Sequence, residues 1–251
     1  MKYIYSIFFS LLLLGQVFAQ KKQTVKVYGI SLDTIDKMVQ KHPKYFDFLK
    51  NKSQMRDKKM SEDEWVMLYY GSVFQKDYNP KKEDKAVEQI ANKLAEMDFN
   101  TAITEAEKLR KIYPVNARLY MLMGYAYKKI GKKQQSKWYY KRYGNIIRIP
   151  LYSGTGASFE QAFVVRIVSD EYLILNQKDL ELSQQALRYH NKYPYDVLGV
   201  QKKSAGNQRL DKLSKQKLYF NIYLPFFVGQ NKTFKKELES AKKKFKVKND
   251  K

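Results

Sequence analysis

Residues 98–143 contain the spacing that most constrains the fold of this chain. A segment that ends at Pro114 leads into a stretch, residues 116–143, in which large aromatic and small residues recur at helical intervals. The recurring residues are Tyr120, Met123, Gly124, Tyr127, Gly131, Ser136 and Tyr140. Alternating large and small side chains let two antiparallel helices approach closely and interlock. We therefore expect a tight helix pair over residues 116–143.

This spacing resembles the tetratricopeptide repeat, a helix-turn-helix unit of about 34 residues. Ala102 precedes Ser136 by one such period. Tyr143 stands where the repeat usually has a small residue, and Ala106 where it usually has a large one, so one repeat matches well and one is degraded. Because roughly three units are needed for a freestanding solenoid, this helical part must pack against another part of the same chain.

The first 19 residues have the three parts of a secretory signal peptide. Lys2 gives the basic start, an apolar run extends from Tyr3 to Leu14, and Val17 and Ala19 are the small residues before the cleavage point. The run is shorter than the ~20 residues that a membrane-spanning helix needs, which disfavours an uncleaved anchor. No cysteine follows it, so a bacterial lipoprotein is excluded. We expect a periplasmic or secreted protein with no transmembrane segment after signal removal.

The composition is strongly basic, with 48 Lys and Arg against 25 Asp and Glu and a formal net charge of +23. An excess of one sign attracts anionic polymers, envelope surfaces or acidic proteins. A general preference for Lys, with most ammonium groups simply solvated, explains the same numbers, and both interpretations stay open. Because the chain has no cysteine, it lacks the disulfides of many exported proteins and must rely on an ordinary hydrophobic core.

Local signals predict further helices before the pair. Asp33 is the expected cap of a first helix, which Pro43 interrupts. The run SEDE is a capping box, in which Ser61 and Glu64 satisfy backbone donors at the start of a helix. The aromatic side chains at 45–48 are expected in the core.

Beyond Pro150 the helical period gives way to the alternation that is typical of strands. A loop of small residues, 153–161, precedes the first of them. The expected strands are AFVVRIV at 162–168, EYLIL at 171–175, QALRYH at 185–190, YDVLGV at 195–200 and KLYFNIYLPF at 217–226, where Pro225 ends the last. Closely spaced strands without helices between them favour antiparallel pairing.

The predicted fold class is therefore α+β, with an N-terminal helical part, including the tetratricopeptide-like pair, packed against a C-terminal antiparallel sheet. The predicted divisions of the chain are a signal peptide at 1–19, the helical part at 20–149, the β part at 150–230 and a Lys-rich amphipathic tail at 231–251.

Several short runs, taken in order, resemble one family of exported bacterial proteins. The runs are LYYG at 68–71, YNP at 78–80, GTG and AFVV within 154–165, DEY at 170–172, YDVL at 195–198 and LYFNI at 218–222. Together they resemble domain of unknown function 4919, a family of uncharacterised exported Bacteroidetes proteins. The resemblance covers most of the chain after the signal and implies helices first and strands last. It implies no activity.

No group of residues in the sequence specifies a reaction. The GTG at 154–156 precedes a strand, whereas phosphate-binding glycine loops follow a strand and open a helix. His42 and His190 lack companions at metal-ligand spacing, and thiolate ligands are absent. We therefore expect no metal and no cofactor.

A hydrolase with its site in the loops of the sheet is the enzymatic alternative. Ser158, His190 and Asp196 have the residue types of a catalytic triad, but no G-x-S-x-G motif surrounds the serine. Asp170 and Glu171 are neighbours, so on a strand they would point to opposite faces and could not flank one bond together. A capping or hydrogen-bonding role is expected for them, and no catalytic residue is assigned.

Partner binding along the first helix of the pair is better supported. In the tetratricopeptide arrangement the inner face of that helix carries the partner. The matching positions here are Arg118, Met121, Tyr125, Lys128 and Lys129. Three cations around an aromatic ring and a methionine can hold an acidic protein or peptide, or a terminal carboxylate, through charge-assisted hydrogen bonds. Packing of the same face on the sheet of this chain is the alternative.

The tail at 232–251 is a second candidate. It holds nine lysines, and Phe234, Leu238, Ala241 and Phe245 form one apolar helical stripe. Such a helix could lie on an anionic membrane surface or a partner groove, or dock on its own domain. Because arginine is scarce, we expect no nucleic acid partner.

The sequence thus predicts an exported, non-catalytic binding or scaffold protein of the bacterial envelope, with a hydrolase and a general polyanion or membrane-surface binder as alternatives.

Overall fold

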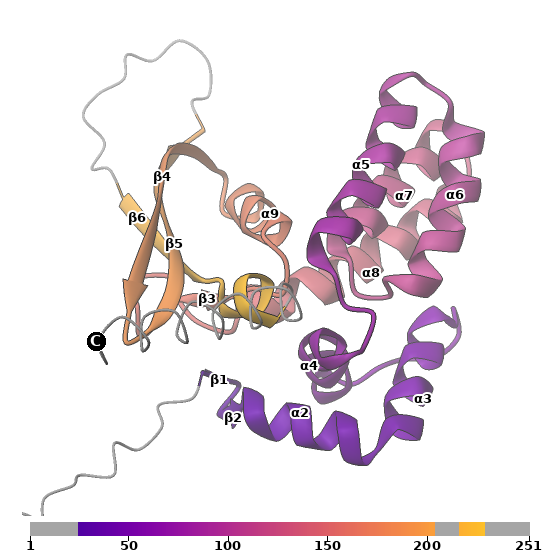
Figure 1. The fold of residues 1–251 in the computed structure, drawn as a ribbon. Helices are drawn as coiled ribbons and strands as arrows, with labels where there is room; N and C mark the ends of the chain where they lie inside the picture. The colour runs from indigo at the N-terminus through magenta and orange to yellow at the C-terminus, as the bar shows by residue number, and fades with distance from the viewer. Residues whose placement is uncertain (1–24, 204–215, 229–251) are drawn as a thin grey trace, which may run out of the picture.

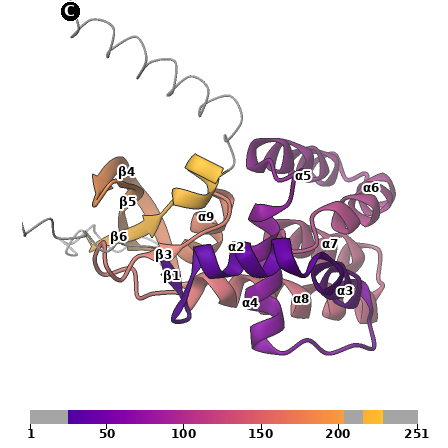
Figure 2. The ribbon, with the colours of Figure 1, turned by 60° about the horizontal axis from the view of Figure 1, so that its bottom comes forward.

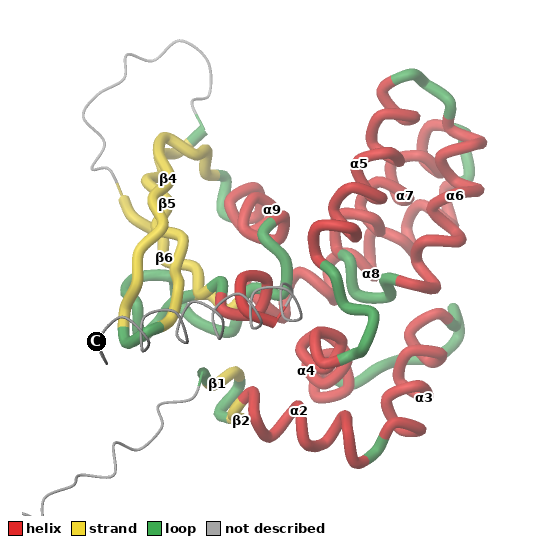
Figure 3. The backbone as a smooth tube through the Cα atoms, viewed as in Figure 1, coloured by secondary structure: helices red, strands yellow, loops and turns green. Residues whose placement is uncertain are grey.

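The computed structural model describes residues 25–203 and 216–228 of this 251-residue chain. Helices make up most of its N-terminal part, and a four-stranded mixed sheet forms the C-terminal part (Figures 1 and 3). This arrangement confirms the α+β fold class. The predicted signal peptide and Lys-rich tail lie outside the described residues. In the described part, no helix has the length and apolar character needed to cross a bilayer.

A small antiparallel hairpin and three helices open the described chain. They are β1 (Lys26–Val27), β2 (Ile30–Ser31), α2 (Leu32–Lys41), α3 (Pro43–Gln54) and α4 (Glu62–Gly71), and the short 3-10 turn η1 (Ser72–Phe74) follows. In Figure 2, α2 crosses α4, on which it packs. The predicted capping box of Ser61 and Glu64 is confirmed. The predicted cap of α2 is wrong, because the Ser31 hydroxyl, and not Asp33, accepts the N–H of Thr34.

The aromatic side chains at 45–48 are only partly in the core. Phe46 is buried, whereas Tyr45 and Phe48 are about half exposed. All three lie on α3, and a helix at the surface presents only one face to the core.

Two helical hairpins follow and stack side by side (Figure 1). They consist of α5 (Pro80–Ala95), α6 (Phe99–Ile112), α7 (Ala117–Lys129) and α8 (Lys133–Leu151). The Ser136 hydroxyl donates to the Gly124 carbonyl over 2.8 Å, and a Cβ at Gly124 would lie 3.0 Å from the Tyr140 ring. These contacts confirm a tight helix pair, and its likeness to a tetratricopeptide unit remains a prediction.

The C-terminal sheet has the strand order β3-β6-β5-β4. Its strands are β3 (Phe163–Val164), β4 (Leu180–His190), β5 (Tyr193–Lys202) and β6 (Gln216–Asn221). The three longer strands pair antiparallel as predicted, but β3 pairs parallel with β6, so the purely antiparallel sheet is corrected to a mixed one. A parallel neighbour is possible because a helix and two strands separate β3 from β6 in the chain.

The run EYLIL is helical, and its prediction as a strand is wrong. It lies in α9 (Ser169–Gln177), which packs on α7 and α8 on one side and on β4 on the other. Leu173, Ile174 and Leu175 are all buried. An apolar run this short has the same pattern in a buried helix and in a buried strand. Here all three residues are apolar because the helix is covered on two sides.

The last predicted strand is shorter than expected. It ends at Asn221, and residues Leu224–Val228 form a π-helical turn, η2, so that Pro225 lies inside a turn and does not end a strand.

Candidate functional site

The five predicted partner-binding residues lie on α7. Arg118 forms an ion pair with Glu88 of α5, with 2.6 Å between nitrogen and oxygen. Met121 is half-buried and packs against the core. Tyr125 is 39% exposed. Its ring makes an edge-to-face contact with the ring of Phe99, the first residue of α6.

The C-terminal end of α7 presents an open cationic surface. The Lys129 ammonium lies 5.4 Å from the centroid of the Tyr125 ring, and Lys128 is also exposed. We call Tyr125, Lys128 and Lys129 the α7 face. These three side chains remain exposed to solvent, so they do not pack on the sheet as the alternative proposed. Arg118 is not available in the same way, because Glu88 already neutralises it.

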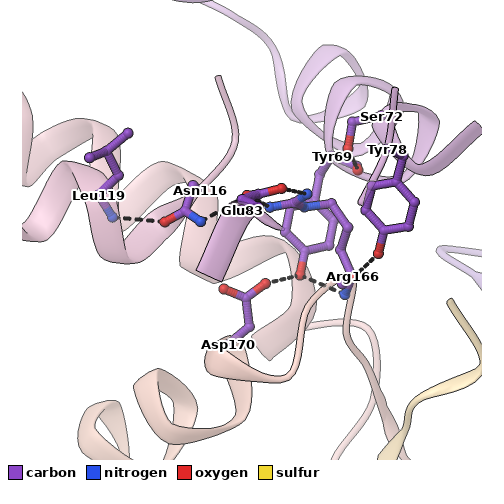
Figure 4. Close-up of polar contacts among 8 residues, drawn as sticks. All are labelled: Tyr69, Ser72, Tyr78, Glu83, Asn116, Leu119, Arg166 and Asp170. Atoms are coloured by element: carbon purple, nitrogen blue, oxygen red, sulfur yellow. Dashed lines mark hydrogen bonds and ion pairs between the residues drawn. The ribbon is translucent and has the colours of Figure 1, made fainter. Parts of the chain in front are cut away.

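A second cluster lies where α4, α5, α7 and α9 meet, and no pattern in the sequence predicted it (Figure 4). Arg166 and Glu83 form two hydrogen bonds of 2.8 and 2.5 Å between guanidinium and carboxylate, and each side chain is only 2% exposed. The Asn116 amide donates to the same carboxylate over 2.8 Å, while its oxygen accepts the N–H of Leu119 and caps α7. One buried carboxylate therefore holds α5, the start of α7 and the segment after β3 together.

Two tyrosines complete this network (Figure 4). The Tyr69 hydroxyl donates to Asp170 over 2.5 Å and accepts the backbone N–H of Arg166 over 3.1 Å. The Tyr78 hydroxyl donates to the Arg166 carbonyl. The guanidinium carbon of Arg166 lies 5.8 and 6.0 Å from the centroids of the Tyr69 and Tyr78 rings, a distance at which cation–π attraction adds to the ion pair.

The two acids of the network have different roles. Burial raises the pKa of Asp170 to about 7, although the positive charge of Arg166 and the Tyr69 hydroxyl act to lower it. Burial acts to lower the pKa of Arg166, but the Glu83 carboxylate outweighs it and holds that pKa above its usual value. Arg166 therefore stays charged with Glu83 as its counter-ion, while Asp170 titrates near neutral pH.

A narrow pocket opens beside the ion pair, and we call it the Arg166 pocket. Arg166 and Glu83 line it, and its volume is about 40 Å³. The rings of Phe46, Tyr78 and Tyr113 also line it. A single water molecule needs roughly 10–15 Å³ of such a cavity, so the pocket admits a functional group and not a whole cofactor.

One donor of the residues that line this pocket is unused. The Nε–H of Arg166 is buried and has no hydrogen-bond partner among the described residues. A buried N–H without a partner costs about 1–3 kcal/mol, so an acceptor atom that reached this donor from the pocket would recover that cost. The sequence signal for this site was the single charged residue within the apolar run AFVVRIV.

A further pair of carboxyl groups lies on the other side of α9. Glu171 is fully buried, and its carboxyl group faces that of Asp196, with which it forms a side-chain hydrogen bond when Glu171 carries a proton. Burial raises its pKa well above the usual value, and Asp196 and Asp170 add to this effect. Asp196, on β5, accepts a hydrogen bond from Gln185 over 2.9 Å. Glu171 is therefore held in its neutral, protonated form next to Asp196.

The expectation of a hydrogen-bonding role is confirmed for Asp170, but its placement on a strand with Glu171 is wrong. Both residues lie in the first turn of α9. From there, Asp170 reaches the helical part and Glu171 approaches β5.

The three residues considered as a catalytic triad, Ser158, His190 and Asp196, do not come together. The Ser158 hydroxyl donates to Glu160 over 2.8 Å, and the His190 ring lies 3.1 Å from the other oxygen of the same carboxylate. The serine is thus bonded to a carboxylate and not to an imidazole that could accept its proton. Asp196 pairs with Leu187 in the sheet, and Leu187 is three residues from His190, so Asp196 and His190 are on opposite faces.

No group of three His, Asp or Glu side chains among the described residues is arranged to hold a metal ion.

Comparison with known proteins places this chain in a family. The family model for Domain of unknown function (DUF4919) matches residues 33–225, which include the α7 face and every residue of the Arg166 network. No curated protein and no solved structure matches the chain. The match confirms the resemblance to this family and covers more than half of the sequence. The chain therefore belongs to the DUF4919 family.

Proposed function

We propose that this protein is a non-catalytic binding protein that captures an acceptor group of its partner in the Arg166 pocket. The observation that carries this proposal is the buried, unpartnered Nε–H of Arg166, a residue that lines a pocket walled by aromatic rings. Because Glu83 already neutralises the guanidinium, a neutral carbonyl oxygen suits this donor as well as a carboxylate does. The partner thus supplies one carbonyl or carboxylate oxygen, followed by an apolar group that packs on the rings.

The position of the titratable groups supports binding over hydrolysis. A catalytic acid or base works best with a pKa near the working pH, and Asp170 has such a pKa. However, Asp170 is fully buried behind the Tyr69 hydroxyl and does not line the pocket. Ser72, which does line it, donates its hydroxyl to the Tyr69 carbonyl. A hydrolase in the loops of the sheet remains the alternative, without a residue that we assign to it.

The α7 face supports a second contact with an acidic peptide. Lys128 and Lys129 are exposed beside the Tyr125 ring, where carboxylates can form charge-assisted hydrogen bonds. These contacts are at the surface and screened by salt, so they steer a partner more than they hold it.

The proposed place of action is the bacterial envelope, in the periplasm or outside the cell. It rests on the signal-like residues 1–19, and general attachment to anionic surfaces rests on the charge of +23.

The direct test follows the Arg166 Nε–H by NMR in the chain from residue 20, the predicted mature form. Titration with acetate and, separately, with N-methylacetamide supplies a carboxylate and a neutral carbonyl. We expect a saturable shift of this one signal with both probes. A signal that both leave unchanged would contradict the pocket proposal.

Capture from envelope extract identifies the natural partner. The wild type is compared with Tyr113→Ala, which opens one wall of the pocket, and with Lys128→Glu/Lys129→Glu. Each is washed at about 0.15 M and 1 M salt, where the screening length falls from roughly 8 to 3 Å. A partner that resists salt and is lost with Tyr113→Ala supports the pocket. A partner lost with salt and with the Glu variant assigns binding to the α7 face instead.

A further inference from the structure

β4 is an edge strand of 11 residues. β5 pairs with one of its edges, and within the described part of the chain no strand pairs with the other (Figure 1). Leu182, Leu187 and Tyr189 on this strand are 39, 43 and 58% exposed. An open edge that carries exposed apolar side chains is a template for pairing with a further strand.

The residues of β4 are complementary to the same strand read in the opposite direction. Two copies can pair antiparallel about a two-fold axis at Gln185, and this register places two complementary pairs on each side of the axis. The facing pairs are Glu181 with Arg188 and Leu182 with Leu187, and beyond them Tyr189 lies opposite Leu180, which is buried in the core of its own subunit. Apolar residues thus meet apolar residues, and carboxylate meets guanidinium, in both halves of the pair.

A bulge in β4 makes this register sterically consistent. Along a regular strand, residues five apart point to opposite faces, so Leu182 and Leu187 could not face each other on one side of a paired sheet. The pairing of β4 with β5 shifts by one residue between Leu182 and Gln184. As a result, Leu182 lies opposite Val200 and Leu187 opposite Asp196, positions four residues apart on one strand and therefore on one face.

The charged pair satisfies the same condition. Glu181 lies opposite Gln201 and Arg188 opposite Tyr195, which are six residues apart on β5 and share the other face. The bulge therefore aligns both arms of β4 for pairing with a second β4 in the complementary register, and a strand without it would align neither.

We propose that β4 docks on β4 of a second copy of this chain, antiparallel and with two-fold symmetry. The two four-stranded sheets then form one continuous sheet across the dimer. A two-fold interface uses the same patch on both subunits, which is what a self-complementary strand provides. The Glu181–Arg188 pairs set the register, and the Leu182–Leu187 pairs cover exposed apolar surface. This dimer does not depend on the Arg166 pocket.

Charge reversal tests the dimer by analytical ultracentrifugation of the chain from residue 20. We expect a dimer for the wild type. Arg188→Glu alone places like charges opposite each other twice, as does Glu181→Arg alone, and each should weaken the dimer roughly tenfold or more. The double variant Glu181→Arg/Arg188→Glu should restore it, and a mixture of the two single variants should form mixed dimers.

Disulfide cross-linking tests the register, because the chain has no cysteine of its own. Leu182→Cys/Leu187→Cys should give covalent dimers on oxidation, whereas either single cysteine should not, since it faces a leucine of the other copy. A monomeric wild type, or a dimer that the single charge reversals leave unchanged, would overturn the proposal. Failure of the double variant to restore the dimer would also overturn it. Selective binding of a different protein at β4 would overturn it as well, because the edge would then serve that protein and not a second copy.

Discussion

Asp170 and Glu171 are neighbours on α9 but face two junctions with different chemistry. On the helical side, Asp170 accepts from Tyr69, and next to it Arg166 pairs with Glu83. On the sheet side, the buried Glu171 carboxyl faces another acid, Asp196, and can bond to it only while Glu171 carries a proton. The helical junction is therefore a network in which nearly every polar atom is matched, whereas the sheet junction keeps an acid neutral by burial.

This difference indicates that the stability of the helical junction depends on paired charges, whereas that of the sheet junction does not. A buried ion pair tolerates its desolvation only while both partners are present, so loss of one partner is far more costly than loss of both. A buried neutral acid carries no such charge, and its contribution depends on whether the pH keeps it protonated.

Removal of one charge from the helical junction should have the largest effect. Glu83→Ala leaves the Arg166 guanidinium buried without its counter-ion and should lower the free energy of unfolding by about 3–5 kcal/mol. Urea denaturation at pH 7 measures this. Glu88→Ala, which breaks an exposed ion pair on the same helix, is the matched control and should cost less than about 1 kcal/mol. Equal losses for the two variants would remove the distinction between this network and an ordinary surface pair.

The next largest effect should be the change in the free energy of unfolding with pH that Asp170 causes. Because the folded state raises the pKa of Asp170 from its usual 3.8 to about 7, the folded protein holds this proton more tightly than the unfolded chain. Its contribution to stability is complete below about pH 4 and is lost as the pH rises to about 7. Asp170→Asn removes this dependence. Between pH 4 and 8, the free energy of unfolding of the wild type should fall relative to that variant by roughly 2–4 kcal/mol. A constant difference between the two would show that Asp170 titrates normally.

The hydroxyl groups of Tyr69 and Tyr172, on the two sides of α9, should contribute different amounts to the free energy of unfolding. Tyr69→Phe leaves Asp170 and the Arg166 N–H without their shared partner in a buried site and should cost about 1–3 kcal/mol. Tyr172→Phe removes an exposed hydrogen bond to Gln185 on the sheet side and should cost less than about 0.5 kcal/mol. Thermal unfolding of both variants at one pH gives the comparison, and a larger loss for Tyr172→Phe would reverse it.

Only a small effect is expected for Glu171→Gln. The amide replaces a neutral carboxylic acid of nearly the same shape, so at pH 5 stability should change by less than about 1 kcal/mol. At pH 8 the variant should gain on the wild type, because only the wild type has a proton to lose. If Glu171→Gln at pH 5 is as damaging as Glu83→Ala, then Glu171 is a charged partner and the comparison fails.

Much of the secondary structure could be predicted because its signals are local. The capping box at Ser61 and the interlocking of Gly124 with Tyr140 depend on residues within one helix turn or one helix pair. The strand character of QALRYH and YDVLGV was also correct, since alternation is visible within a single strand.

The prediction of the sites was less complete. The α7 face could be named from repeat spacing, but the pairing of Arg118 with Glu88 required knowledge of how α5 packs on α7. Arg166 was visible only as a charge in an apolar run, and its partner Glu83 lies 83 residues earlier in the chain. No local pattern links two such positions.

The sequence by itself determined the helix pair at 116–143, the helix start at Ser61 and the three antiparallel strands, because spacing within an element dictates which side chains meet. Tertiary structure alone decided that β3 pairs parallel with β6, that EYLIL is a helix, and that Glu83 and Arg166 meet in the core. An apolar run is stable as helix or strand according to what covers it, and a buried charge is stable only where a distant element brings its counter-ion.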